Sequence, residues 1–334
     1  MRLFIAESLP GVPIIEIISR TVHSSQEPIY DNIFSESKKI CGSDAILVPH
    51  DAYDFVNFQD YMSYIKNLSK SKLIIFSDRG DFPKNPNFNN SISLRVAINP
   101  SESKKNKIVV PYNVKKLDNF NYRNYAENPK LSFMGYMPKF TLGRMIKVLE
   151  TAPLNPILGN SSLVRRISIA KIRRSQLDFV FTNRQTYHLS QKDRELRNIW
   201  NLEYLAQIEN SDIVLCPRGD ANQSQRFYEV LSAGRIPLIP NTKILFPFHS
   251  KHEQFYKKNL IFFDLLRPQV NRLTLDYWNQ IKNQDSYFKL QKANRDFYLN
   301  VLEFNGFMRR LFAGDLTSFM KLASFATYTK LDIG

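Results

Sequence analysis

The chain has 334 residues, of which 43% are apolar and 13% aromatic, and this length and composition exclude a short peptide and a disordered chain and predict about two domains. Lys and Arg number 46 against 31 Asp and Glu, a formal net charge of +15, which favours anionic partners: nucleotide phosphates, nucleic acid, acidic glycans or anionic lipid. The two cysteines, Cys41 and Cys216, are too few for a disulfide framework or a CxxC metal site.

The N-terminal residues do not have the pattern of a signal peptide. Glu7, Pro10, Pro13 and Glu16 interrupt the apolar runs there. Nowhere does the sequence contain the roughly 20 consecutive apolar residues of a membrane span. We therefore expect a cytoplasmic protein that contacts a membrane, if at all, only at its surface.

Short apolar runs alternate with longer amphipathic stretches, the pattern of strands feeding crossover helices in parallel sheets. In the first half the predicted strands are residues 3–6, 45–49, 73–77, 94–98 and 108–111, and the predicted helices are 30–41 and 58–69. A polar, Asn-rich stretch at 117–130 suits a linker. In the second half the predicted strands are 131–134, 177–182, 213–216, 236–239 and 260–263, with helices at 142–150, 163–174, 190–209 and 286–321. Two similar α/β halves follow one another.

Residues 212–241 are the most informative segment and have the pattern of one β-α-β unit. An apolar run at 213–216 predicts a strand, helical periodicity follows at 223–233, and Gly234 marks the end of that helix. The loop 217–223 therefore lies between the carboxyl end of a strand and the start of a helix, where α/β folds hold ligands.

The side chains of this loop and helix suit a diphosphate. N–H groups at the helix start attract an anion, Arg218 and Arg226 supply forked donors, and Ser224 either caps the helix or binds a phosphate oxygen. Glu229 lies three residues after Arg226, on nearly the same helical face, where a carboxylate can accept hydrogen bonds from ribose hydroxyls. The alternative for Arg226 and Glu229 is a surface ion pair without a ligand.

The same residues resemble the signature of the exostosin family of glycosyltransferases. The family has a Pro-Arg-Gly loop, a Ser-x-Arg, a helix Glu and a Gly-x-Ile-Pro strand, and these match 217–219, Ser224 with Arg226, Glu229 and 234–237. Further segments resemble the family's other landmarks in the same order: DAILVPHDAY at 44–53, KLIIFSDRGD at 72–81, KIVVPYN at 107–113, LSFMGYM at 131–137 and then Arg144.

The resemblance implies a GT-B architecture, in which two Rossmann-like, doubly wound domains face one another across a cleft. We expect an acceptor-binding domain at residues 1–128, a nucleotide-sugar-binding domain at 129–300 and a helical segment at 301–334 that packs back across both. The implied reaction is inverting transfer of a hexosyl or pentosyl group from a UDP-sugar to a hydroxyl of a glycan or glycolipid. The implied donor-binding residues are Arg144, Arg218, Gly219, Ser224, Arg226 and Glu229.

Inversion needs a base for the attacking hydroxyl. Asp78 follows a predicted strand and matches the family's Asp, although the family's His-Asp-Trp-Gly is replaced by residues 77–80, Ser-Asp-Arg-Gly. His50, Asp51 and Asp81 are the alternates, and any of the four also suits an ordinary loop. No Asp-x-Asp metal pair occurs, so we expect no metal and no cofactor, with arginines and the helix start stabilising the leaving diphosphate. A second departure from the family is Arg235, which replaces its usual Cys.

Other functions stay open at this stage. The predicted helix at 163–174 carries a basic cluster, which suits a solvated face or peripheral contact with anionic lipid. The cluster comprises Arg165, Arg166, Lys171, Arg173 and Arg174. The alternatives to a glycosyltransferase are a basic nucleic-acid-binding protein and an inactive glycan-binding relative. Since no nucleic-acid-binding module is recognisable, we expect no nucleic acid partner.

Overall fold

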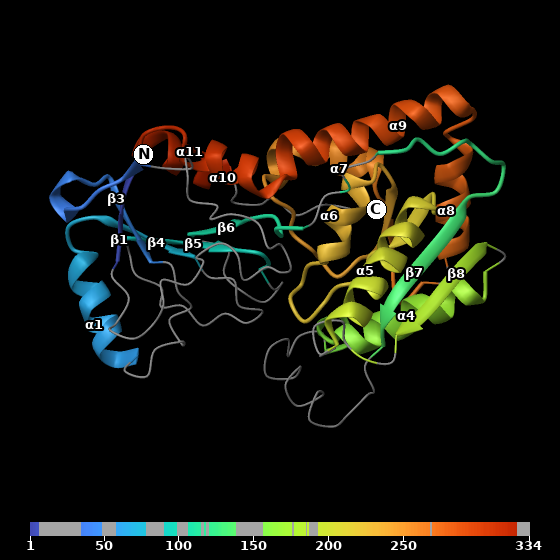
Figure 1. Ribbon diagram of the computed structural model, residues 1–334, viewed down its shortest axis with the longest axis horizontal. Coiled ribbons are helices and arrows are strands. Elements are labelled where there is room, and N and C mark those ends of the chain that lie inside the picture. The colour runs from blue at the N-terminus through green and yellow to red at the C-terminus, as the bar shows by residue number, and fades with distance from the viewer. Residues whose placement is uncertain are drawn as a thin grey trace. The chain divides into compact units, whose positions relative to one another are not determined.

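The computed structural model describes residues 1–6, 35–48, 58–77, 90–98, 106–114, 117, 120–137, 156–175, 177–184, 186, 193–267 and 269–325. The chain forms two compact units (Figure 1). The first unit contains Met1–Lys115, Leu245–Glu253 and Asn300–Gly334, and the second contains Lys116–Ile244 and Gln254–Leu299. Each unit is built on a parallel sheet with flanking helices, which confirms the predicted α/β class with two Rossmann-like domains.

The sheet of the first unit has six parallel strands in the order β2-β1-β3-β4-β5-β6. These are β1 (Arg2–Ile5), β2 (Ser35–Glu36), β3 (Ala45–Val48), β4 (Leu73–Ser77), β5 (Ser91–Arg95) and β6 (Lys107–Val109). The unit also contains η1 (Ile40–Gly42), α1 (Phe58–Leu68), α10 (Phe304–Phe312) and α11 (Leu316–Phe325).

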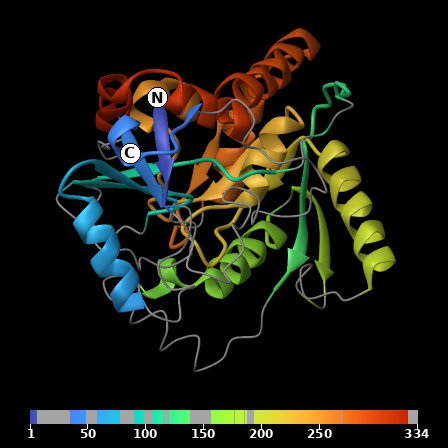
Figure 2. The ribbon, with the colours of Figure 1, turned by 60° about the vertical axis from the view of Figure 1, so that its left-hand side comes forward.

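Alternate residues of these strands face two different helical layers. Ile46 and Ile74 pack with Ile65 of α1, whereas their neighbours Ala45 and Leu73 share a core cluster with α10 and α11. Figure 2 shows α1 on one side of the blue strands and the red C-terminal helices on the other. The first unit is therefore a helix-sheet-helix sandwich whose strands are buried on both faces.

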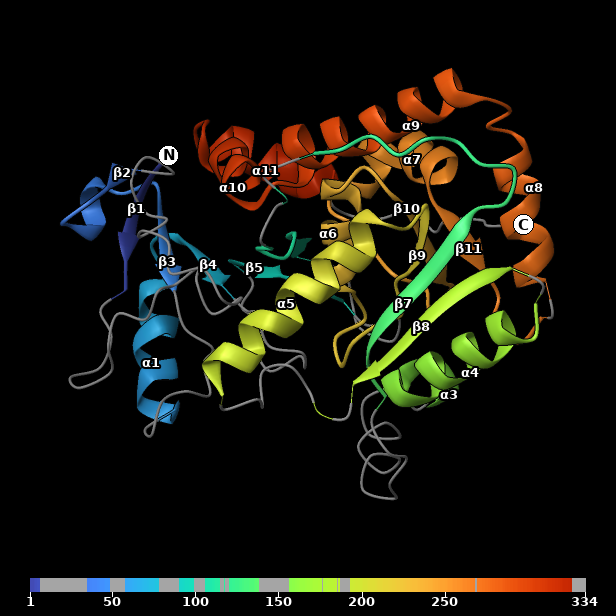
Figure 3. The same ribbon diagram turned by 45° about the vertical axis from the view of Figure 1, so that its right-hand side comes forward.

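The sheet of the second unit has five parallel strands in the order β11-β10-β9-β7-β8. These are β7 (Lys130–Tyr136), β8 (Asp178–Arg184), β9 (Ile213–Leu215), β10 (Ile236–Pro240) and β11 (Ile261–Phe263). Its helices are α3 (Pro156–Gly159), α4 (Ser161–Arg173), α5 (Arg194–Glu209), α6 (Gln225–Ser232), α8 (Val270–Asn279) and α9 (Gln284–Phe297). Two further elements, α7 (His249–Asn259) and the π-helix η4 (Tyr298–Leu302), begin in one unit and end in the other. Figure 3 shows β7 and β8 side by side between α5 and α4.

The strand order of each sheet reverses at one point. In the second unit the chain passes from β7 to β8 on one side and then returns to β9 on the other side of β7. In the first unit β1 and β3 are related in the same way. Ligands of open parallel sheets bind beyond the carboxyl ends of the two strands at such a switch point, so β7 and β9 mark the expected site in the second unit.

Local sequence explains why these helices begin and end where they do. Asn160 caps α4 by accepting hydrogen bonds from the backbone of Ser162 and Leu163 at 3.0 and 3.1 Å. Gly234 follows α6 with a φ of +65°, and a Cβ at this position would lie 2.6 Å from the ring of Phe120. Only glycine fits there without strain, which confirms the predicted end of α6.

The structure differs from the expected elements in several places. Within residues 30–41, where a helix was expected, the described part contains the strand β2 and the start of η1. The helical stretch expected at 286–321 is divided among α9, η4, α10 and α11. The stretch 117–130 is not an independent linker, because Tyr125 stacks on Trp278 at 5.4 Å and the indole N–H of Trp278 donates to the carbonyl of Ala126.

Candidate nucleotide-binding site

The guanidinium of Arg226 connects the two switch-point strands of the second unit. Arg226 is the second residue of α6. It donates through Nη2 to the carbonyl of Met134 in β7 and through Nη1 to the carbonyl of Leu215, the last residue of β9, at 3.4 Å. The guanidinium carbon also lies 4.3 Å from the centre of the Phe133 ring. Helix α6 thus holds a cation at the carboxyl edge of the sheet.

Tyr204 of α5 links Arg226 to Glu229. The Nε of Arg226 donates to the Tyr204 oxygen at 3.1 Å, and the Tyr204 hydroxyl donates to Oε2 of Glu229. Burial raises the pKa of Glu229, while the Tyr204 hydrogen bond and the Arg226 charge act in the opposite direction. Within the described residues no other hydrogen bond reaches this carboxylate, so Oε1 of Glu229 is available as an acceptor.

Arg218 holds the loop that precedes α6. Its guanidinium donates to the backbone carbonyls of Leu158 at 3.0 Å, Asp220 at 2.8 Å and Gly219 at 3.2 Å. The residue is only 5% exposed. The loop is closed by a hydrogen bond from the Gly219 N–H to the carbonyl of Gln223 at 2.9 Å. The contacts of Arg218 therefore order the loop itself.

The start of α6 has no side-chain cap. Ser224 occupies the N-cap position, but its hydroxyl makes no capping hydrogen bond. The first N–H groups of the helix are therefore not satisfied by the usual serine contact. Asn222 donates its amide to the carbonyls of Thr242 and Lys243 at 3.2 and 3.3 Å, and its buried carboxamide oxygen accepts no hydrogen bond from the described residues. The loop thus has donors at the helix start and one buried acceptor.

The structure describes most of the predicted donor-binding residues but none of the candidate bases. Arg218, Gly219, Ser224, Arg226 and Glu229 all lie on the loop and first turns described above. Arg144 and the four candidate bases, His50, Asp51, Asp78 and Asp81, lie outside the described residues. Along the chain Asp78 is the residue after β4, while His50 and Asp51 follow β3, a switch-point strand. Among the residues that are described, no three His, Cys, Asp or Glu side chains are grouped as metal ligands.

Tyr204 and Asn222 were missed by sequence reasoning. Tyr204 lies 22 positions before Arg226. It is on helix α5, and no local sequence pattern shows which residues of that helix reach Arg226. Asn222 lies within the predicted ligand loop 217–223. An amide side chain in such a loop can bind a ligand, so the sequence did contain a signal for this residue.

The basic cluster on α4 is partly structural. Arg165 donates to the carbonyls of Tyr136 at 2.8 Å and Arg218 at 3.4 Å. Lys171 donates to the carbonyl of Arg267 at 2.8 Å, and the Arg173 guanidinium carbon lies 4.3 Å from the centre of the Phe181 ring. These three side chains hold the second unit together. In the described part of the chain, no helix is long and apolar enough to cross a membrane.

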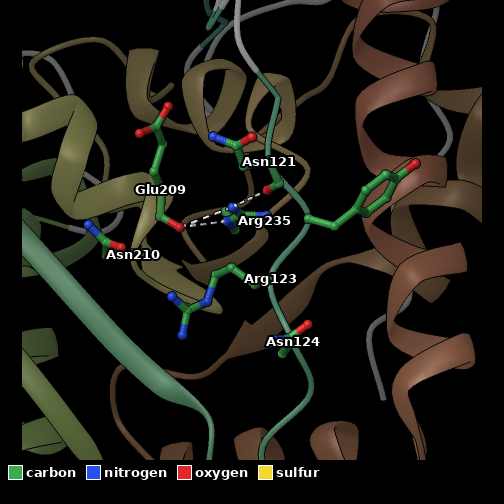
Figure 4. Close-up of a pocket in the computed structure, with 7 residues that line it drawn as sticks. Asn121, Arg123, Asn124, Glu209, Asn210 and Arg235 are labelled. Atoms are coloured by element: carbon green, nitrogen blue, oxygen red, sulfur yellow. Dashed lines mark hydrogen bonds between the residues drawn. The ribbon is translucent and has the colours of Figure 1, made fainter.

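A polar pocket of about 380 Å³ lies near the amino ends of β7, β9 and β10 (Figure 4). Arg235 at its base donates to the carbonyls of Glu209 and Asn121, as the dashed lines in Figure 4 show, and to Oε1 of Gln291 at 2.7 Å. Arg123 pairs with Asp212 at 2.7 Å. The arginines of this pocket are thus bound to the protein itself. Arg235 ties α5 and α9 to the sheet through its hydrogen bonds to Glu209 and Gln291.

No family model matches the chain, and no curated protein matches it. Among solved structures, a glycosyltransferase from Rickettsia africae ESF-5 has a TM-score of 0.38 at 10% identity, over 98% of this chain and 99% of that one. TarM has a TM-score of 0.35 at 11% identity, over 80% of this chain and 57% of TarM. A GtfA/B complex bound to UDP and GlcNAc has a TM-score of 0.28 at 10% identity, over 82% and 57%. None of the three TM-scores reaches 0.5, so the functional assignment rests on the residues of this chain.

Proposed function

We propose that the protein is a glycosyltransferase whose second unit binds the nucleotide of a UDP-sugar. The observation that carries the proposal is the chain of contacts from Arg226 through Tyr204 to Glu229 at the carboxyl ends of β7 and β9. It combines a fixed cation, an uncapped helix start and a carboxylate oxygen without a partner in the described residues. A diphosphate joined to a ribose presents the complementary groups in one molecule.

Each group has a distinct role in this proposal. The diphosphate lies at the start of α6, where backbone N–H groups and the helix dipole stabilise negative charge, and it takes further N–H donors from the edge of Arg226. Glu229 accepts hydrogen bonds from the ribose hydroxyls through Oε1, while Tyr204 fixes Oε2. Arg218 acts indirectly, because its donors order the loop.

Transfer then proceeds with inversion at the sugar carbon. A hydroxyl of a glycan or glycolipid acceptor attacks the anomeric carbon as the bond to the diphosphate breaks. Asp78 takes the proton of that hydroxyl. Negative charge develops on the leaving diphosphate, and Arg226 with the start of α6 stabilises it without a metal ion.

Calorimetry with UDP and 2′,3′-dideoxy-UDP tests the ribose assignment. The parent protein should bind UDP about ten-fold or more tighter than the dideoxy compound, because a half-buried carboxylate loses its hydroxyl donors in the latter. In Glu229→Ala the two compounds should bind with nearly equal affinity. Arg174→Ala, which removes an exposed charge of the same unit, is the matched control and should keep the preference.

Two results would contradict the proposal. If Glu229→Ala kept the full preference for UDP over the dideoxy compound, Glu229 would not hold the ribose. If the parent bound a single-stranded oligonucleotide and neither UDP nor any other nucleotide, a nucleic-acid-binding function would replace the glycosyltransferase.

A further inference from the structure

Strand β8 forms an edge of the second sheet among the described strands. It pairs with β7 on one side, and no other strand of the described chain follows it in the sheet order. None of its seven residues is buried. Natural proteins usually shorten, bulge or cover such an edge, because a free edge strand pairs with other chains.

The unpaired backbone groups of β8 can be assigned from the register. The Lys130 carbonyl accepts from the Asp212 N–H on the β9 side, so the next residue of β7, Leu131, directs its backbone toward β8. Leu131 pairs with Phe179 in a parallel register. Since backbone groups alternate along a strand, Phe179, Phe181 and Asn183 direct their N–H and C=O groups away from β7. No backbone hydrogen bond to these groups occurs within the described residues.

The sequence of β8 is complementary to itself in charge. The strand begins with exposed Asp178 and ends with Arg184, whose guanidinium also contacts Glu203 and the ring of Trp200 in its own chain. If two copies pair antiparallel about a two-fold axis at Phe181, Asp178 of each copy lies opposite Arg184 of the other. Opposite charges directly across an antiparallel pair are stabilising, and like charges are destabilising.

Exposed apolar side chains also occur on β8 and on α5. Val180 of β8 is 36% exposed, and Ile199 and Leu202 of α5 are 46% and 67% exposed. Ile199 and Leu202 are three residues apart and therefore share one face of the helix. Gln207 of the same helix donates to the Val180 carbonyl at 3.1 Å, which holds α5 against β8.

We propose that β8 is the dimerisation surface of this protein, and that its occupant is β8 of a second copy, paired antiparallel about a two-fold axis at Phe181. Such a dimer joins two five-stranded sheets and uses the same surface on both copies, as two-fold dimers require. The charge pattern sets the register, because a shift along the strand separates Asp178 from Arg184.

The sharpest test uses two variants that should each lose dimerisation alone and form dimers when they are mixed. Asp178→Lys places Lys opposite Arg184 at both ends of the dimer, and Arg184→Glu places Glu opposite Asp178. Each variant should dimerise about ten-fold or more weakly than the parent by analytical ultracentrifugation. In an equimolar mixture the heterodimer has Lys opposite Glu at one end and Asp opposite Arg at the other, so dimers should return.

A backbone variant tests the same surface without changing its charge. Asn183→Pro removes an N–H that points away from β7, which edge strands tolerate, and should abolish dimers. Asn183→Ala is the matched control and should leave them intact. Melting temperatures show whether each variant is folded. The native Arg184 side chain pairs with Glu203, so Arg184→Glu could fail to fold. In that case Asn183→Pro tests whether β8 is the dimerisation surface.

Three results would overturn the proposal. The first is that the parent stays monomeric over the whole concentration series. The second is that the parent dimerises but a mixture of Asp178→Lys and Arg184→Glu stays monomeric. The third is that Asn183→Pro leaves the dimer unaffected. The proposal does not depend on the nucleotide-binding function, since dimerisation is measured without a ligand.

Discussion

Gly135 lies so close to Arg226 that a Cβ added to it would be 3.0 Å from Nη2 of the guanidinium. That nitrogen also donates to the carbonyl of Met134, so the guanidinium is held against the backbone of β7. A side chain at position 135 would push it away from this place. Glycine at position 135 therefore leaves the space that the Arg226 guanidinium occupies in the candidate nucleotide site.

We expect Gly135→Ala to weaken UDP binding by about three- to ten-fold, equivalent to roughly 0.7 to 1.4 kcal/mol, because the guanidinium must shift by a few tenths of an ångström. Calorimetry measures the affinity. Arg174→Ala, which removes an exposed charge of the same unit, is the control and should bind UDP like the parent. Equal affinity in the parent and Gly135→Ala, with both proteins folded, would show that the position of Arg226 does not matter for UDP.

The raised pKa of Glu229 predicts a pH dependence of stability. Burial raises the pKa of Glu229 above its ordinary value of 4.5. The folded protein therefore binds this proton more tightly than the unfolded chain. Ionisation of Glu229 costs stability above the raised pKa, and the cost disappears as the pH falls through the raised pKa to 4.5.

Glu229→Gln removes this cost while keeping an acceptor for Tyr204. The variant should melt at a higher temperature than the parent near neutral pH, and the difference should shrink toward zero at pH 4.5 and below. Thermal unfolding of both proteins across this range measures it. A difference that grows as the pH falls would mean that the carboxylate is stabilised, not penalised, by its surroundings.

The sequence predicted the inner strands β3 and β10 well because they are buried on both faces. Ala45–Val48 and Ile236–Pro240 are buried at every position, so continuous apolar runs marked them. The start of β5 was misplaced for the same reason. Val96, Ala97 and Ile98 are as buried as the strand itself. Buried residues outside a strand give the same apolar run in the sequence as buried residues within one.

Helix α7, which was missed, carries no such apolar pattern. Helix α7, HSKHEQFYKKN, is mostly polar, so its apolar residues do not form a helical stripe. The candidate site was predictable only where its parts are close in sequence. The loop and α6 form a continuous segment, whereas Tyr204 and Gly135 reach Arg226 from other elements through tertiary packing.

Asp212 anchors a buried polar network that should control stability and not binding. Its carboxylate, 2% exposed, accepts from Nε of Arg123 at 2.7 Å, the Lys130 N–H at 2.8 Å and the Tyr287 hydroxyl at 2.7 Å. Asp212→Asn leaves Arg123 without its counter-charge. We expect a loss of about 3 to 5 kcal/mol in the free energy of unfolding, measured by urea denaturation.

Asp264→Asn is the control for this variant. Asp264 is 48% exposed and lies 3.7 Å from Arg267, so its loss should cost about 1 kcal/mol or less. Folded Asp212→Asn protein should bind UDP like the parent, because the network lies at the amino end of β9, opposite Arg226. A large loss of UDP affinity without a loss of stability would mean that Asp212 belongs to the ligand site.

Transfer should not require a divalent metal. In the proposed mechanism Arg226 and the start of α6 supply the positive charge that the leaving diphosphate needs. Product formation from a UDP-sugar should therefore continue at a similar rate in excess EDTA. Loss of transfer in EDTA, with recovery on adding manganese or magnesium, would replace this mechanism with a metal-dependent one.

Asp78 is the residue we expect to act as the general base. It directly follows β4, Leu73–Ser77, and the carboxyl ends of parallel strands are where α/β proteins place catalytic groups. A positioned base contributes about 10² to 10⁴ in rate, whereas an Asp that only stabilises a turn contributes mainly to folding. Asp78→Asn should keep the melting temperature and UDP affinity of the parent, because the nucleotide contacts proposed here come from the second unit, while transfer falls by at least about 10². Near-normal turnover would exclude Asp78, and the same assay on Asp51→Asn, His50→Gln and Asp81→Asn would then decide which of the three remaining residues takes the proton.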